Sequence, residues 1–123
     1  MKWVLVLASL YGASGVAMGA FAAHGLKQVL SPQLLTVMDT GVRYQLWHAL
    51  ALVAVFLLAD KLSGPWLTAA GGLFAFGVLA FSGSLYALAL TGAKWFGPIT
   101  PIGGMALILG WLALMLAAFK ETV

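Results

Sequence analysis

Four long apolar stretches, separated by short polar breaks, constrain this chain more than any other feature of its sequence. They cover about residues 3–23, 43–59, 66–90 and 99–119. About 20 apolar residues in a helix cross a bilayer core, and a helix satisfies its own backbone polar groups there. Hydrophobic residues make up 63% of the chain and charged residues 7%, whereas soluble domains carry about 25% charged residues. The sequence predicts an all-α integral membrane protein, a single antiparallel four-helix transmembrane bundle over residues 1–123.

Residues 26–42 form the only long segment outside these stretches, and their apolar residues recur largely at intervals of three and four. This spacing is typical of an amphipathic helix. Ser31 followed by Pro32 indicates a helix start, an N-cap residue and then a proline at the first helical position. We therefore expect a short amphipathic helix over about 32–41 that lies in the membrane interface, with Gly41 bending the chain into the second span.

The first apolar stretch begins like a signal peptide, with Lys2 before an apolar run. It continues for about 20 residues, which is the length of a span and favours a transmembrane helix. Within it, Gly15 and Gly19 form a GxxxG motif that lets another helix backbone approach closely. Packing within the chain is the favoured interpretation, and a dimer contact is the alternative.

Composition excludes several classes of function. The chain contains no cysteine, so disulfides, thiolate metal sites and cysteine nucleophiles are excluded. Its six Lys and Arg residues stand singly between apolar stretches, so no nucleic-acid partner is expected. Two histidines without a third ligand are a weak pattern for zinc, and a bis-histidine haem is the remaining alternative. We predict no metal and no cofactor, and membrane lipids, a second copy of the chain or another membrane protein as partners.

An even number of spans places both termini on one side of the membrane. The basic residues divide evenly, Lys2, Lys61 and Lys120 on that side and Lys27, Arg43 and Lys94 on the other. The first helix breaks the tie, because Lys2 and the α-amino group flank its start and only Lys27 follows its end. We therefore expect a multi-pass protein of the cell inner membrane with cytoplasmic termini.

Most polar residues in or beside the spans fall at one predicted membrane face. Polar groups in hydrocarbon are costly without partners, so such residues form either a structural network or a functional site. We expect Tyr44, Gln45 and His48 to face the bundle interior and to approach Ser82 or Tyr86. The candidate polar site comprises His24, Asp39, Arg43, Tyr44, Gln45, His48, Ser82, Ser84, Tyr86 and Thr100.

Two expectations concern charge at this site. Asp39 and Arg43 stand four positions apart, so we expect an ion pair on one helix face. If Asp39 instead points into water, Arg43 and the helix starts at this face mark an anion site. His48 is expected to be neutral at pH 7, with one ring nitrogen donating and the other accepting from the hydroxyl of Tyr44 or Tyr86. Replacing His48 with alanine should then cost more stability than a lipid-facing substitution.

Several short motifs, taken together and in this order, resemble the YgdD/YwdK-like family of small inner-membrane proteins. They lie at residues 19–25 (GAFAAHG), 40–51 (TGVRYQLWHALA), 81–90 (FSGSLYALAL) and 100–104 (TPIGG), followed by Gly110 and Trp111. One departure is Ala22, where the family pattern leads us to expect glycine. The family has no assigned reaction, so the resemblance implies a small multi-span membrane protein and no catalytic residues.

The favoured function is that of a small membrane protein without catalytic activity, a structural or accessory subunit with a polar network at one membrane face. The alternative is a small transporter or channel subunit for a small polar or anionic solute or a lipid headgroup. An enzyme is not expected, because Asp39 is the only carboxylate near the polar cluster and no nucleophile, base and acid occur together.

Overall fold

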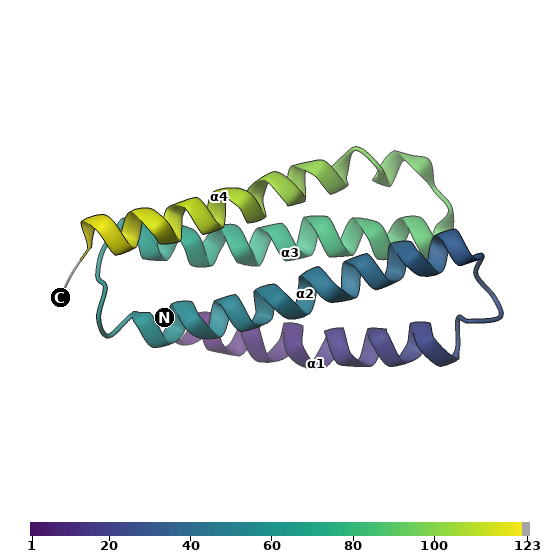
Figure 1. The fold of residues 1–123 in the computed structure, drawn as a ribbon, viewed down its shortest axis with the longest axis horizontal. Helices are drawn as coiled ribbons and strands as arrows, with labels where there is room; N and C mark the ends of the chain where they lie inside the picture. The colour runs from purple at the N-terminus through teal and green to yellow at the C-terminus, as the bar shows by residue number, and fades with distance from the viewer. Residues whose placement is uncertain (122–123) are drawn as a thin grey trace.

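The computed structural model describes residues 1–121, which fold into four long helices and one short turn of 3-10 helix. The long helices run antiparallel, and α1 begins at the end of the bundle where α4 finishes (Figure 1). Each is long and apolar enough to cross a membrane. The predicted all-α four-helix fold is confirmed. The elements are α1 (Lys2–His24), α2 (Pro32–Leu58), α3 (Pro65–Thr91), η1 (Lys94–Phe96) and α4 (Ile99–Lys120).

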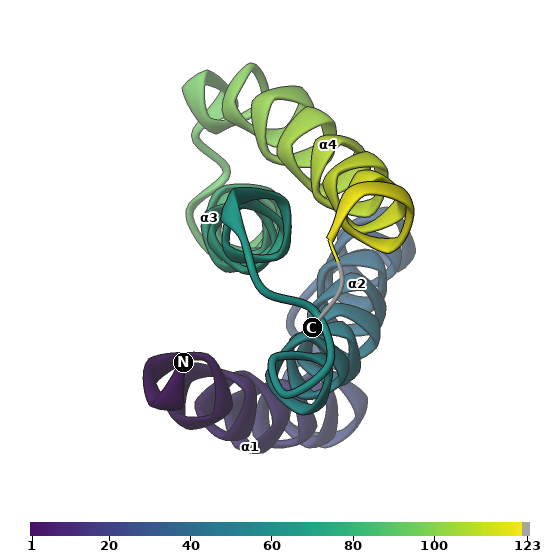
Figure 2. The ribbon, with the colours of Figure 1, turned by 90° about the vertical axis from the view of Figure 1, so that its left-hand side faces the viewer.

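Helices that follow one another in the chain are neighbours in space. Helix α2 packs against α1 and α3, and α3 packs against α4, whereas the backbones of α2 and α4 make no close contact within residues 1–121. Seen along the helices, α3 lies between α1 and α4, and α2 lies at its side (Figure 2). Short connections explain this order, because a helix hairpin brings sequential helices together. The consequence is an opening between α2 and α4 on the side away from α1.

Glycines determine how closely the helices approach one another. A Cβ atom at Gly103 of α4 would overlap the backbone nitrogen and Cα of Phe81 in α3. On the other side of the bundle, a Cβ at Gly15 of α1 would lie 2.7 Å from the Leu46 side chain, and one at Gly19 would lie 3.3 Å from Val42. The GxxxG motif therefore packs within the chain, against α2, as predicted.

The expectation of a separate interfacial helix over residues 32–41 is wrong. Residues 32–41 are the first turns of one continuous helix, α2, which the Ser31 hydroxyl caps by accepting from the Leu34 N–H at 3.3 Å. The amphipathic pattern has a different cause, because its apolar side is buried inside the protein, with Met38 packed beside Leu26 of the preceding turn and Ala89 of α3. Gly41 does not end the helix.

Gly41 instead gives room to an aromatic ring of α3. A Cβ atom at this position would lie 2.7 Å from Cε1 of Tyr86, so the tyrosine ring rests directly on the α2 backbone. The nearby Ser82 hydroxyl donates to the Gly41 carbonyl at 2.7 Å. A glycine at this position therefore serves the packing of two helices and not a change of direction.

The side-chain carboxylate of Glu121, which follows α4, caps the start of α3. The backbone N–H groups of Trp66 and Leu67 donate to Glu121 at 2.5 Å and 3.1 Å, and the Glu121 residue is only 5% exposed. The first N–H groups of a helix have no partner within it, and a negative charge is favoured at that end. The N-cap residue, Gly64, has φ +148°, and a Cβ there would overlap the carboxylate.

Replacing Glu121 with alanine is expected to lower the free energy of unfolding by about 0.5–2 kcal/mol, the usual cost of losing an N-terminal cap. Glu121→Gln retains one side-chain acceptor and should lose less. Thermal unfolding in detergent would measure the difference, and amide exchange at Trp66 and Leu67 would locate it. Exchange at these two amides that stays at the parental rate in Glu121→Ala would contradict the cap.

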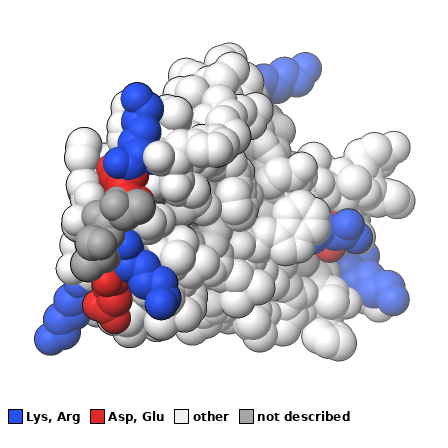
Figure 3. Space-filling view, turned by 60° about the vertical axis from the view of Figure 1, so that its left-hand side comes forward, with Lys and Arg blue, Asp and Glu red and all other residues white. Residues whose placement is uncertain are grey.

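Charged side chains lie toward the two ends of the helices, and a broad uncharged surface separates them (Figure 3). Large apolar side chains cover this surface, among them Leu10 at 60% exposure and Leu79 at 67%. In water such a surface would be unfavourable, but lipid chains solvate it. The distribution is that of a membrane-spanning bundle.

Candidate functional site

The deepest polar residues lie near the middle of the bundle, whereas the sequence pattern placed them at one face. Because α2 begins at Pro32 and ends at Leu58, Gln45 is thirteen residues from each end. Eleven residues of α2 precede Arg43, which corresponds to about 16 Å of helix. The predicted position near the membrane face is therefore wrong for Gln45 and His48, because the preceding segment extends their own helix.

Gln45 joins three helices through hydrogen bonds. Its amide nitrogen donates to the Tyr11 carbonyl at 2.9 Å and to the Ser14 hydroxyl at 2.8 Å, both in α1. Its amide oxygen accepts from the Tyr86 hydroxyl of α3 at 2.6 Å. The residue itself is 5% exposed. Three of the four hydrogen bonds that an amide side chain can make are thus formed, and the expected approach to Tyr86 is present.

Tyr11 adds a further link from α1 to α3, because its hydroxyl donates to the Ala75 carbonyl at 2.7 Å. Tyr11, Ser14, Gln45 and Tyr86 are called the Gln45 network below. Within residues 1–121 no buried side-chain nitrogen or oxygen lacks a hydrogen-bond partner. Each buried polar atom of the Gln45 network therefore has at least one partner within the chain.

His48 connects α2 to α4. Its Nδ1 lies 2.7 Å from the Tyr44 carbonyl, which only accepts, and its Nε2 accepts from the Trp111 indole N–H at 3.0 Å. This pair of bonds requires a neutral ring protonated at Nδ1, in agreement with the predicted donor and acceptor roles. The predicted hydroxyl partner is wrong, because Trp111 fills the space on the α4 side. The imidazole also packs on Phe74, with ring centroids 5.5 Å apart.

The other serine and threonine of the candidate site make a separate contact between α3 and α4. The Ser84 and Thr100 hydroxyl oxygens lie 2.6 Å apart. Thr100 is the second residue of α4, which begins at Ile99 with Pro98 as its N-cap. The Thr100 hydroxyl is directed to Ser84 instead of to its own backbone.

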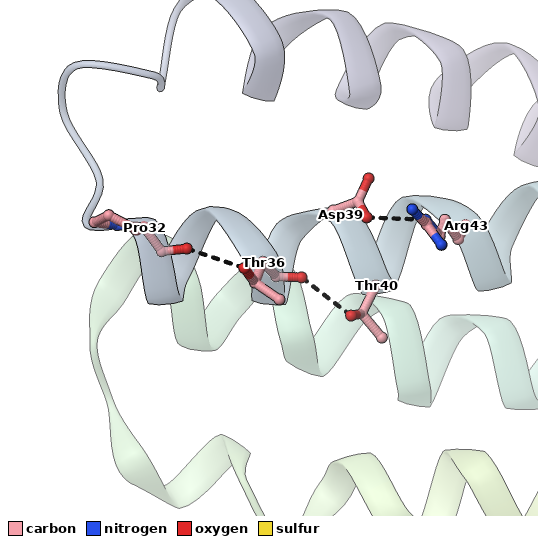
Figure 4. Close-up of polar contacts among 5 residues, drawn as sticks. All are labelled: Pro32, Thr36, Asp39, Thr40 and Arg43. Carbon is pink, nitrogen blue, oxygen red and sulfur yellow. Dashed lines mark hydrogen bonds and ion pairs between the residues drawn. The ribbon is translucent and has the colours of Figure 1, made fainter.

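Asp39 and Arg43 form the predicted ion pair on the exposed side of α2 (Figure 4). Arg43 Nε lies 2.9 Å from an Asp39 carboxylate oxygen, and the side chains are 63% and 58% exposed. Beside them, the Thr36 and Thr40 hydroxyls donate to carbonyls one turn earlier, at 3.0 Å each. An exposed pair of this spacing contributes only about 0.3–0.5 kcal/mol. It is not part of the Gln45 network.

His24 is not brought to His48. It is exposed at the end of α1. Gly19 of α1 lies beside Val42 of α2, so these two residues stand at the same height along the antiparallel helices. From that contact His24 lies five residues toward one end of the bundle and His48 six residues toward the other. Eleven residues of helix correspond to roughly 16 Å. Within residues 1–121, no three His, Asp or Glu side chains gather as metal ligands do.

A groove of about 610 Å³ lies between α2 and α4, where their backbones do not touch. Its wall on α2 carries the Tyr44 ring, which packs on Trp47 and, at 4.8 Å between centroids, on Phe81 of α3. Contrary to expectation, Tyr44 faces this groove and the surface, at 36% exposure. The lining includes Tyr44, Trp47, His48, Phe81, Gly104 and Trp111. The groove, called the α2–α4 groove below, is apolar and aromatic.

Comparison with known proteins extends over almost the whole chain. The model of the family described as "Protein of unknown function (DUF423)" matches residues 18–104. The chain belongs to the DUF423 family. Members similar to it include the UPF0382 membrane protein YwdK of Bacillus subtilis, 45% identical over 121 residues and 98% of each chain. A UPF0382 membrane protein of Haemophilus influenzae is 42% identical over 117 residues, 95% of this chain and 94% of its own.

A third member of the family, a UPF0382 membrane protein of Staphylococcus epidermidis, is 41% identical over 122 residues and 98% of each chain. No solved structure matches. The family resemblance inferred from the motifs is thus confirmed, and the relatives are named as membrane proteins. Motif residues of this DUF423 chain meet in the fold, since Gln45 bonds Tyr86 and His48 bonds Trp111.

Sequence reasoning missed four residues that make important contacts. Tyr11 and Ser14 stand at positions three apart in the middle of α1, where two polar residues in an apolar span are themselves a signal for a partner. Trp111 lies near the middle of α4, far from the headgroup region where tryptophan is usual. The sequence does not indicate the role of Glu121, because an acidic residue that follows the last residue of a helix, here Lys120, is normally solvated.

His48→Phe is expected to lower the free energy of unfolding by about 0.6 kcal/mol and at most about 1.7 kcal/mol, the average and the largest value for hydrogen bonds between transmembrane helices. The change keeps a ring beside Phe74 but removes the acceptor of Trp111. Trp111→Phe should cost a similar amount, and the double variant should cost less than the sum of the two. Urea or thermal unfolding in detergent would measure all three. Strict additivity would mean that the two side chains do not interact.

Proposed function

We propose that this protein is a non-catalytic structural or accessory subunit of the bacterial inner membrane, whose buried polar residues hold its own helices together. The observation that supports this most is that, within residues 1–121, every buried side-chain polar atom already has an intramolecular partner. A site that turns over or passes a solute needs polar atoms that exchange partners with it. In the Gln45 network those atoms bond one another.

The alternative, transport of a small polar solute, has less support from the geometry. A pathway would have to continue past Gln45 toward the other end of the bundle, where the buried residues include Leu52, Val55 and Phe74, each fully buried. Charged solutes do not cross such a region without polar groups to replace their water. A subunit role needs no pathway, only contact surfaces, and apolar side chains cover the outside of all four helices.

We place both termini on the cytoplasmic side. The basis is the flanking of α1, which has Lys2 and the α-amino group at its start and Lys27 after its end. Labelling of single cysteines at exposed Lys61 and Lys94 with a membrane-impermeant reagent tests this in intact cells. The chain contains no other cysteine. The proposal predicts labelling at position 94 only.

Two experiments on the purified protein and its native membrane test the subunit role. In proteoliposomes, the parent should pass potassium, chloride and phosphate no faster than empty vesicles. In native membranes, a single cysteine at exposed Leu10 or Leu109 should form a discrete cross-linked product with a second membrane protein or another copy. Flux that disappears in a folded Gln45→Leu variant would overturn the proposal in favour of transport. Absence of any cross-linked product from both positions would contradict a subunit.

A further inference from the structure

We propose that the α2–α4 groove is the seat of one bound anionic phospholipid, with an acyl chain between the two helices and the phosphate at Arg43. This inference does not depend on the subunit role, because a resident lipid is compatible with either a subunit or a transporter. It rests on three features of the described residues: the shape of the groove, the hydroxyl of Tyr44 and the guanidinium of Arg43.

The groove has the form that a lipid chain requires. On α4 it extends from Gly104 to Trp111, seven residues or about 10 Å of helix. Gly104 lies five residues after the start of α4 at Ile99, so the groove runs from near the basic face toward the middle of the bundle. It opens sideways because the α2 and α4 backbones are not in contact. Its volume is about 610 Å³, and in a membrane lipid fills a lateral opening of this kind.

Tyr44 supplies a polar atom at the groove. Its ring lies against Phe81 and Trp47, but its hydroxyl makes no hydrogen bond to any side chain or carbonyl within residues 1–121, in contrast to Tyr11 and Tyr86. Tyr44 lies twelve residues after the start of α2, within the apolar region, where a hydroxyl without a partner is unfavourable. Phospholipids carry ester and phosphate oxygens next to their chains, and these accept a hydrogen bond.

Arg43 supplies the charge. It precedes Trp47, which lines the groove, by one helical turn, and 63% of its side chain is exposed. Its ion pair with Asp39 joins Nε to a carboxylate oxygen at 2.9 Å. A guanidinium binds phosphate well through parallel N–H groups. Its long side chain can also reach toward the headgroup level while its stem stays in the apolar region.

The selectivity of the groove among lipids depends on the headgroup. An acyl chain that enters the groove leaves one apolar environment for another. The acyl chain by itself therefore gives little selectivity among membrane lipids. Lys27, Arg43 and Lys94 lie in this half of the bundle, and Asp39 is the acid beside Arg43. Three positive charges and one negative charge leave a net of +2, which favours an anionic headgroup over a zwitterionic one.

Native mass spectrometry of the detergent-purified full chain tests the proposal with two lipids that share their dioleoyl chains, phosphatidylglycerol and phosphatidylcholine. The parent should retain one phosphatidylglycerol and prefer it to phosphatidylcholine. Arg43→Gln should reduce this preference about fivefold, since a basic residue near an anionic surface contributes about 1 kcal/mol. Thermal unfolding of each variant establishes that it is folded.

Groove-filling variants locate the lipid. A Cβ at Gly104 would lie 3.5 Å from Phe81, an ordinary contact, so Gly104→Leu fills the groove without forcing the backbones apart. Ile108→Trp does the same from a lining residue that is 55% exposed. Both should lose the bound lipid. The matched control is Gly72→Leu, at an exposed glycine of α3 with no atom within 4 Å of the added Cβ, and it should bind as the parent does.

Three results would each overturn the proposal. The first is equal retention of both lipids by the parent and by Arg43→Gln. The second is lipid retained at the parental level in folded Gly104→Leu and Ile108→Trp. The third is a dimer that these two variants dissociate while lipid binding is unchanged, which would make a second copy of the chain the occupant of the groove.

Discussion

Replacing Gly103 with alanine is expected to disrupt the packing of α3 against α4 and to cause a large loss of stability. The added Cβ would overlap the backbone nitrogen and Cα of Phe81. These atoms belong to a helix and cannot rotate away, so α4 has to move as a whole. Overpacking of this kind costs about 1–3 kcal/mol, and we expect the upper end because main-chain atoms collide. Thermal or chemical unfolding in detergent would measure the loss.

The neighbouring residue provides the control. Gly104→Ala adds the same methyl group one position along α4, where its nearest contact is a Phe81 ring carbon at 3.5 Å. This ordinary distance predicts a change within about 0.5 kcal/mol. Similar losses for the two variants would mean that the close approach of the Phe81 backbone to Gly103 is not the cause, since helix propensity by itself favours alanine at both positions.

Replacing Gln45 with leucine is expected to be the most damaging change among the buried polar residues. Leucine has a similar size but leaves the Tyr86 hydroxyl without its acceptor and removes both donors to α1. A buried polar group without a partner costs about 1–3 kcal/mol. Gln33→Leu is the matched control, the same change at an exposed position in the first turn of α2, and it should leave stability nearly unchanged.

A double-mutant cycle isolates the contact between α2 and α3. Tyr86→Phe removes the donor, Gln45→Leu removes the acceptor, and the double variant leaves neither group unpaired. The coupling free energy should be about 0.6–1.7 kcal/mol, as for other hydrogen bonds between transmembrane helices. Unfolding in detergent would give all four values. A coupling of zero would mean that the two side chains find other partners or water.

Much of the fold follows from local sequence. Apolar length determines how many helices span the membrane, and short polar turns determine their antiparallel order, because both are properties of single segments. Ser31 and Pro32 marked the start of α2 correctly. The same local reasoning failed for residues 32–41, since an amphipathic pattern does not say what covers its apolar side. Here Leu26 and Ala89 cover Met38, so the segment joins α2.

Local sequence also identified most of the polar residues that meet, but not their partners. Gln45 and Tyr86 were both candidates, whereas Tyr11, Ser14 and Trp111 were not. Partner choice depends on how each helix is rotated and how far it is shifted along its neighbour. A single residue in a span carries no information about either quantity.

The sequence by itself therefore determined the class of protein, the number of helices and the family. Only the tertiary structure decided the position of the Gln45 network near the middle of the bundle, the contact of Glu121 with α3 and the opening between α2 and α4. The physical reason lies in the glycine contacts. Gly15 and Gly103 let particular pairs of backbones approach, and this approach sets the rotation and level of the helices, which in turn determine the side chains within hydrogen-bonding distance.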